Sequence, residues 1–73
     1  MNARPRKRSL TLRGHRTSVS LEDAFWDEFR RIAAQRGQSV NDLAAEIDAE
    51  RIMTSGLASA IRVFVLSEVK AGR

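Results

Sequence analysis

Cysteine is absent from this chain of 73 residues, and histidine and proline each occur only once. The absence of cysteine excludes disulfides and thiolate metal sites. A single histidine, His15, is too few for a structural metal site. We therefore expect no metal and no cofactor. Because a domain of this size buries little surface by itself and lacks these covalent or metal cross-links, we expect it to be stabilised as a homodimer.

Long apolar runs are also missing. The most apolar segment, residues 57–66, is interrupted by Ser59 and Arg62. It is about half as long as the roughly 20 residues that a membrane-spanning helix needs. The basic N-terminal stretch is not followed by the apolar stretch of a secretory signal. We therefore expect a cytoplasmic protein with no membrane partner.

Positive charge is concentrated near the N-terminus. The formal net charge is +4, but residues 1–16 hold six Lys/Arg and no Asp/Glu, while the other seven Lys/Arg stand against all nine acidic residues. We predict that residues 1–8 form a disordered basic arm ahead of a domain over residues 9–73. Segregated positive charge suits binding to the phosphates of a nucleic acid, although a solvated tail would have the same composition.

Two short runs alternate apolar and polar residues, as half-buried strands do. Apolar residues occupy even positions in residues 9–13 and odd positions in residues 16–21, and Gly14 lies where the parity changes. The runs are either one strand with a bulge at Gly14 or two strands of a hairpin, and alternation alone fits both. The inward face of the second run would hold Thr17, Val19 and Leu21. Its exposed face would hold Arg16, Ser18 and Ser20.

Helices are predicted after these runs. The first begins at residue 22 or 23, with acidic residues in its first turns, and ends before Gly37. The second follows Ser39, a candidate N-cap, and ends at about residue 51 or 52.

The last apolar segment, about residues 55–70, is predicted to be a third helix capped by Ser55. Residues 63–66 would also suit a strand, but the apolar period that starts at Leu57 is helical. A segment that is apolar on several sides needs burial on several sides, in a dimer or against another protein. The predicted dimer core consists of Val19, Leu21, Phe25, Phe29, Ile32, Leu43, Ile47, Ile61 and Phe64.

The order of strand, helix, Gly-x-Ser turn and helix resembles the ribbon-helix-helix family of bacterial DNA-binding proteins. The resemblance covers residues 16–51 and rests on the strand TSVSL at residues 17–21, a helix of family-like length and the turn GQSVNDL at residues 37–43. The runs LRGHRTSVSLE and SAIRVFVL, at residues 12–22 and 59–66, also resemble a poorly characterised subfamily of short ribbon-helix-helix proteins.

The resemblance implies a mainly α chain with one short β-strand and an extra C-terminal helix. It also implies a homodimer whose two strands pair as an intermolecular two-stranded antiparallel ribbon that enters the major groove. If residues 9–13 instead form a hairpin with residues 16–21, this ribbon would be rearranged.

The function implied is sequence-selective binding to double-stranded DNA by a transcriptional regulator in the cytoplasm, associated with the nucleoid, as one dimer or several side by side. Bases would be read by Arg16, Ser18 and Ser20, with Arg16 suited to guanine. Phosphates would be contacted by Arg4, Arg6, Lys7, Arg8, Arg13, Ser39, Val40 and Asn41.

Two other functions are possible on the sequence alone. A protein-interaction module, such as an antitoxin, would bind its partner through the apolar segment at residues 57–69. An enzyme is disfavoured, because His15 has neither a positioned nucleophile nor a ligand set, and Asp23, Asp27 and Glu28 are expected on a solvated helix face. We therefore predict no catalytic residue.

Overall fold

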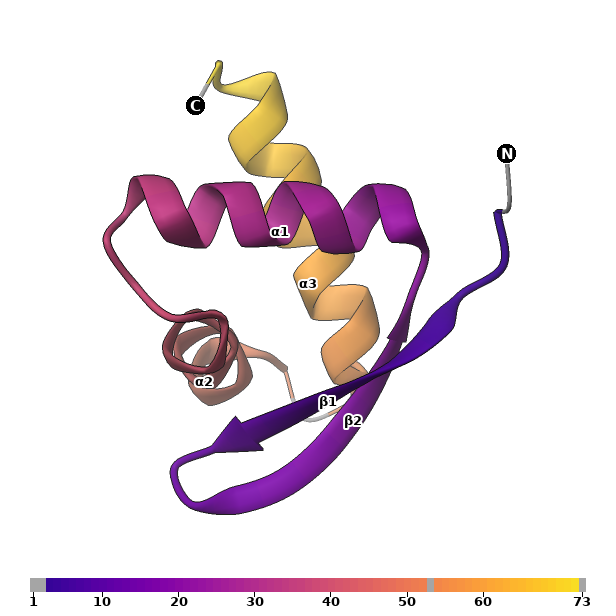
Figure 1. The fold of residues 1–73 in the computed structure, drawn as a ribbon, viewed down its shortest axis with the longest axis vertical. Helices are drawn as coiled ribbons and strands as arrows, with labels where there is room; N and C mark the ends of the chain where they lie inside the picture. The colour runs from indigo at the N-terminus through magenta and orange to yellow at the C-terminus, as the bar shows by residue number, and fades with distance from the viewer. Residues whose placement is uncertain (1–2, 53, 73) are drawn as a thin grey trace.

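The computed structural model describes residues 3–52 and 54–72, and within them a two-stranded sheet precedes three helices (Figure 1). The elements are β1 (Arg6–Leu12), β2 (His15–Leu21), α1 (Asp23–Gln35), α2 (Val40–Glu50) and α3 (Leu57–Lys70). α1 and α2 both pack on α3, and α2 also contacts β1. The helices therefore cover one face of the hairpin and leave the other face open.

β1 and β2 form an antiparallel hairpin whose closing pair is Leu12 and His15. Its two-residue turn has φ angles of 51° at Arg13 and 86° at Gly14, and two positive φ angles are what a type I′ turn requires. A turn of two residues sets even positions of β1 opposite odd positions of β2. This pairing explains the change of parity at Gly14 and confirms the hairpin interpretation.

The prediction of one short strand per chain is therefore wrong. In the structure β2 pairs with β1 of the same chain, over the whole length from Leu12 opposite His15 to Arg6 opposite Leu21. A lone strand would leave both edges unpaired, which was the physical reason to expect pairing between chains. In this structure β1 supplies backbone hydrogen-bond partners to one edge of β2 from within the same chain.

β1 also begins earlier than expected, at Arg6, inside the segment predicted to be a disordered arm. Residues 6–8 pair with residues 19–21 instead of extending into solvent. The alternation was hidden in the sequence because Arg6 and Arg8 occupy inward positions that are normally apolar. Residues 1–2 of the predicted arm lie outside the described residues.

The first two helices match their predicted bounds. Ser39 is the N-cap of α2, and its Oγ accepts a hydrogen bond of 3.0 Å from the backbone N–H of Asp42. α3 is helical throughout residues 63–66, which settles the strand alternative. Its N-cap is Gly56, so the prediction that Ser55 caps this helix is wrong.

The hydrophobic core is built within one chain. Its buried residues are Leu10, Val19, Leu21, Phe29, Ile32, Ala33, Leu43, Ala44, Ile47, Ile61 and Val65. Phe25 and Phe64, both predicted in the core, are only partly buried. Ile61 is fully buried, with 0% exposure, so α3 is part of this core and not an appendage.

Candidate nucleic-acid interface

The hairpin has two chemically different faces, because side chains alternate along each strand and paired residues share a face. The inner face turns toward the helices, and its residues Leu10, Val19 and Leu21 are buried in the core. The other face, which we call the outer face, consists of three cross-strand pairs: Lys7 with Ser20, Ser9 with Ser18, and Thr11 with Arg16. All six of these side chains are exposed.

The three predicted base-reading residues, Arg16, Ser18 and Ser20, therefore lie together on the outer face. Three residues of β2 were predicted to face inward. Val19 and Leu21 are buried, whereas Thr17, nearer the turn of the hairpin, is exposed. Sequence reasoning missed Ser9 and Thr11 on the outer face and placed Lys7 in a disordered arm. The signal that would have found all three is the pairing that a two-residue turn imposes.

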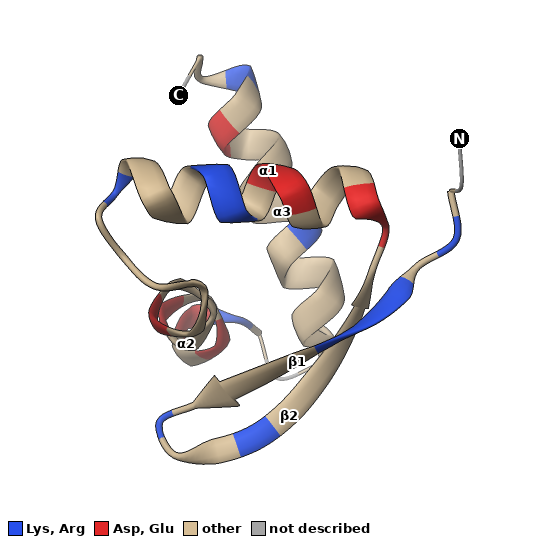
Figure 2. Ribbon diagram, in the orientation of Figure 1, with Lys and Arg blue, Asp and Glu red and all other residues tan. Residues whose placement is uncertain are grey.

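The outer face offers hydrogen-bonding groups and positive charge without a carboxylate. Its four hydroxyls can both donate and accept hydrogen bonds, and Lys7 and Arg16 donate with a full positive charge. An arginine can bind O6 and N7 of guanine with two parallel hydrogen bonds. In Figure 2 the ribbon is blue at the start of β1, on one stretch of β2 and at the turn, where Arg13 is exposed. Such a surface can contact both bases and phosphates.

Arg8, one of the predicted phosphate ligands, is occupied inside the protein. Its guanidinium donates to the carbonyl oxygen of Leu21 at 3.2 Å and to the carboxylate of Asp23. It also lies 5.4 Å from the centroid of the Trp26 ring, and its side chain is only 15% exposed. These contacts give Arg8 a structural part in holding β1 against α1.

The other predicted arginines of this segment are more accessible. Arg6 Nε lies 3.8 Å from the Asp23 carboxylate, and its side chain is 60% exposed. Arg4 is exposed as well. Both are exposed, and Arg6 presents its charge beside the start of α1.

The start of α2 is tied to the hairpin. The side-chain oxygen of Asn41 accepts a 3.0 Å hydrogen bond from the backbone N–H of Thr11 on β1. Arg13 shares a surface hollow with Gln38 and Asp42 at the same end of α2. The first N–H groups of a helix have no partner within it, so Val40 and Asn41 can present theirs at this surface. The structure thus brings the predicted residues Ser39, Val40 and Asn41 close to the turn of the hairpin.

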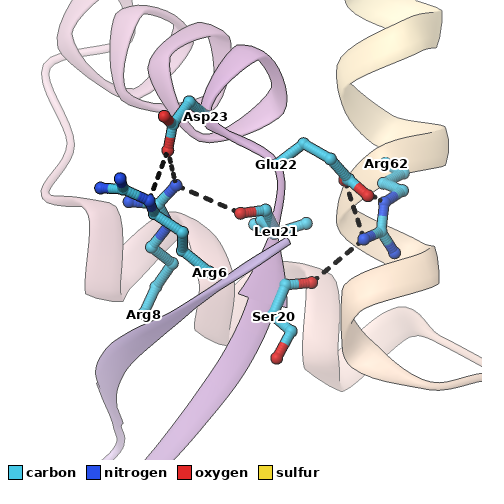
Figure 3. Close-up of polar contacts among 7 residues, drawn as sticks. All are labelled: Arg6, Arg8, Ser20, Leu21, Glu22, Asp23 and Arg62. Carbon is cyan, nitrogen blue, oxygen red and sulfur yellow. Dashed lines mark hydrogen bonds and ion pairs between the residues drawn. The ribbon is translucent and has the colours of Figure 1, made fainter. Parts of the chain in front are cut away.

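Two carboxylates at the start of α1 fix the far end of the hairpin (Figure 3). Asp23 pairs with Arg6 and Arg8 of β1. Glu22 pairs with Arg62 of α3 at 2.8 Å, and Arg62 Nη2 also donates to the carbonyl oxygen of Ser20 at 3.1 Å. The sequence placed Asp23 on a solvated helix face, because no local pattern joins it to partners 15 or more residues away.

These ion pairs change the acidity of both carboxyls. The hydrogen bond from Arg8 holds the pKa of Asp23 below its usual value. Hydrogen bonds from its own backbone N–H and from Arg62 lower the pKa of Glu22. Both groups therefore stay ionised at neutral pH and keep their ion pairs with these arginines.

His15 is exposed at the closing pair of the hairpin and lines an open hollow with Thr17, Asp48 and Arg51. Among the residues that the structure describes, no group of three or more His, Cys, Asp or Glu is placed to hold a metal ion. In the same ranges no helix is long and apolar enough to cross a membrane.

Comparison with known proteins identifies the family. A family model described as a ribbon-helix-helix domain matches residues 5–69, which include both strands and nearly all of α3. Searches among curated proteins and among solved structures found no match. Ribbon-helix-helix domains generally bind DNA, as transcription regulators or antitoxins, typically dimerise and are not enzymes. On this match over most of its length, the chain belongs to the ribbon-helix-helix domain family.

Proposed function

We propose that this protein is a transcriptional regulator that binds double-stranded DNA sequence-selectively, with the outer face of the hairpin in the major groove. The observation that carries the proposal is the outer face itself, whose six exposed side chains include two cations and no carboxylate. Two strands lie about 4.8 Å apart, so a two-stranded ribbon with its side chains fits a groove roughly 12 Å wide.

The roles follow from the chemistry of each group. Arg16 reads guanine, and Ser18 and Ser20 contact bases with less discrimination, because a hydroxyl can both donate and accept. Phosphate contacts come from Arg4, Arg6, Arg13 and the start of α2 at Ser39, Val40 and Asn41. Lys7 lies on the outer face, where it can contact phosphate as well as a base. Arg8 is left out of this set because its guanidinium is engaged by Asp23 and Leu21.

We propose that the protein acts as a homodimer in the cytoplasm, bound to the nucleoid. The tendency of ribbon-helix-helix domains to dimerise supports this, together with apolar side chains that one chain leaves uncovered on α3. Val63 and Leu66 are 65% and 55% exposed, and because they lie three residues apart on α3 they share one side of that helix. Burial of this surface against a second copy would supply the stabilisation expected of a short chain without disulfides.

The test is a fluorescence-anisotropy titration of labelled genomic duplexes with the wild type and with Arg16→Ala. We expect the wild type to prefer a subset of duplexes, and its affinity to fall steeply as salt rises. Arg16→Ala should weaken binding to the preferred duplex by about 1–3 kcal/mol, the discrimination of one bidentate contact. Arg30→Ala, which removes the same charge from an exposed position on α1, is the matched control. Unchanged discrimination in Arg16→Ala would contradict the assignment.

A second candidate function is binding to another protein, as an antitoxin does. The same exposed residues of α3 favour it, since Val63, Leu66 and Val69 form an apolar surface that a partner other than a second copy can cover. Leu66→Asp would then abolish a purified heteromeric complex while DNA binding persists. Loss of self-association in Leu66→Asp, with no heteromeric complex found, would favour the homodimer.

A further inference from the structure

We propose that each chain carries a complete DNA-reading ribbon of its own, with Lys7, Ser9 and Thr11 of β1 as base-reading residues beside those of β2. This inference rests on the proposed DNA binding and assigns three further reading residues to it. It also changes what a dimer would do, since the second copy is not needed to build the ribbon.

The two strands resemble each other at five of their seven positions. β1 reads RKRSLTL and β2 reads HRTSVSL, so Ser9 matches Ser18 and Leu12 matches Leu21, nine positions later in each case. Three further positions match in chemistry, since Lys7 and Arg16 are cations, Leu10 and Val19 are aliphatic, and Thr11 and Ser20 carry hydroxyls. The other two positions, Arg6 with His15 and Arg8 with Thr17, differ. The chain therefore contains a strand repeat, joined by Arg13 and Gly14.

In the observed register, an approximate two-fold axis relates β1 to β2 and brings the matched residues of the repeat onto each other. Ser9 and Ser18 are paired directly, so they lie at the centre of the outer face. On either side of this centre, each strand presents one cation toward its start and one hydroxyl toward its end. Lys7 and Arg16 consequently lie at opposite ends of the outer face. This is the symmetry that two copies of one strand would create, here obtained from a single chain.

Contacts at the two open edges follow the same symmetry. On the edge of β1, the backbone N–H of Thr11 donates to Asn41 of α2. On the edge of β2, the carbonyl oxygen of Ser20 accepts from Arg62 of α3. Thr11 and Ser20 are matched positions of the repeat, so each strand is held from its outer side by a helix of its own chain. The ribbon is thus anchored without a second copy.

This arrangement changes what the dimer contributes. If one chain fills one stretch of major groove with its own ribbon, two joined chains place two ribbons at a distance set by their interface. The DNA site of one ribbon is then read by Lys7 and Arg16 from its two ends. We expect both cations to contribute to discrimination among sequences.

The first experiment tests where the ribbon is formed. Thr11 directs its N–H outward to Asn41, so Thr11 and Arg16 are a non-hydrogen-bonded pair and, by alternation, so are Ser9 and Ser18. Cβ atoms are closest in such pairs, which suits a disulfide. The chain has no cysteine of its own, so the double variant Ser9→Cys/Ser18→Cys reports on this contact alone.

After oxidation of the full chain, we expect the double variant to run as a monomer on a non-reducing gel, and its intact mass to be two hydrogens lower, at every protein concentration. Chains cross-linked to each other in place of the internal bond would overturn the proposal. Ser9→Cys and Ser18→Cys alone are the matched controls and should give no internal bond. This readout does not depend on DNA.

The second experiment tests base reading by β1. On duplexes selected with the wild type, Lys7→Ala should reduce the preference for the best sequence about 5- to 150-fold, as Arg16→Ala does, while the control Arg30→Ala keeps it. If Lys7→Ala weakens binding equally on every duplex, Lys7 contacts only phosphate and the assignment to β1 is overturned, although DNA binding stands. If the wild type binds no duplex at low salt, the proposed function fails and the base-reading roles fail with it, whatever the disulfide shows.

Discussion

Ile61→Ala is the substitution that tests most sharply whether α3 belongs to the core of a single chain. Ile61 has 0% exposure and lies in one buried cluster with residues of β2, α1 and α2, such as Leu21, Phe29 and Leu43. Replacement by alanine removes three carbon atoms, worth about 2.4 kcal/mol at about 0.8 kcal/mol for each buried CH₂. The cavity left behind raises the expected loss to about 3–4 kcal/mol. A domain of this length has a total stability of about 4–11 kcal/mol, so the loss is a large fraction of it.

The assay is urea unfolding followed by circular dichroism, with every variant at the same protein concentration so that self-association affects all of them alike. Ser67→Ala is the matched control on the same helix, because Ser67 is exposed and is not one of the apolar residues assigned to the homodimer, so its substitution should change stability by less than about 0.5 kcal/mol. Equal losses of stability in the two variants would contradict the burial of Ile61 in the core.

Three further predictions concern the elements that position the outer face. Gly14→Ala should destabilise the hairpin by about 1–2 kcal/mol in the same urea assay, because φ is +86° there and a Cβ is strained in that conformation although the space around it is open; an unchanged midpoint would contradict the type I′ turn. Ser39→Ala should cost about 1 kcal/mol, since it removes the hydroxyl that accepts from the backbone of Asp42; no loss would mean that the cap contributes nothing. Asp23 should stabilise the fold above its unfolded-state pKa of about 4, and this contribution should be lost as pH falls through the lower pKa that its bond to Arg8 produces. Melting temperatures measured against pH should therefore fall below about pH 4, and less steeply in Asp23→Asn; identical slopes would contradict the pairing.

The helices were predictable because their signals are local. Ser39 followed by Asp42 three residues later is a pattern of helix starts, and the structure shows the hydrogen bond that this pattern implies. Gly37, at φ 67°, ends the α1 segment as a left-handed residue usually does. The cap of α3 was less predictable, because Ser55 and Gly56 are both acceptable in that position and only the geometry distinguishes them.

The hairpin was only partly predictable. The parity change at Gly14 required a turn or a bulge, but alternation records which residues share a face and not which strand lies alongside. The length of β1 was hidden by Arg6 and Arg8 at inward positions, where apolar residues are expected. The repeat between the strands becomes visible once the register aligns Ser9 with Ser18.

The candidate site shows the same limit for charges. Composition groups all arginines of the N-terminal segment together, yet Arg8 is held by Asp23 and the Trp26 ring, whereas Arg16 is exposed on the outer face. Which charge is used inside the fold depends on contacts between residues that are far apart in sequence. Only the three-dimensional arrangement separates the structural arginines from those available to DNA.

The function proposed for this chain depends on base reading by the outer face of the hairpin. The most direct measurement compares wild type, Arg16→Ala, Lys7→Ala and the control Arg30→Ala in anisotropy titrations on one preferred and one unrelated duplex at two salt concentrations. We expect a steep salt dependence for the wild type, and a preference for one duplex that Arg16→Ala and Lys7→Ala both reduce and that Arg30→Ala keeps. Equal affinities of all four proteins for both duplexes would contradict base reading by this face.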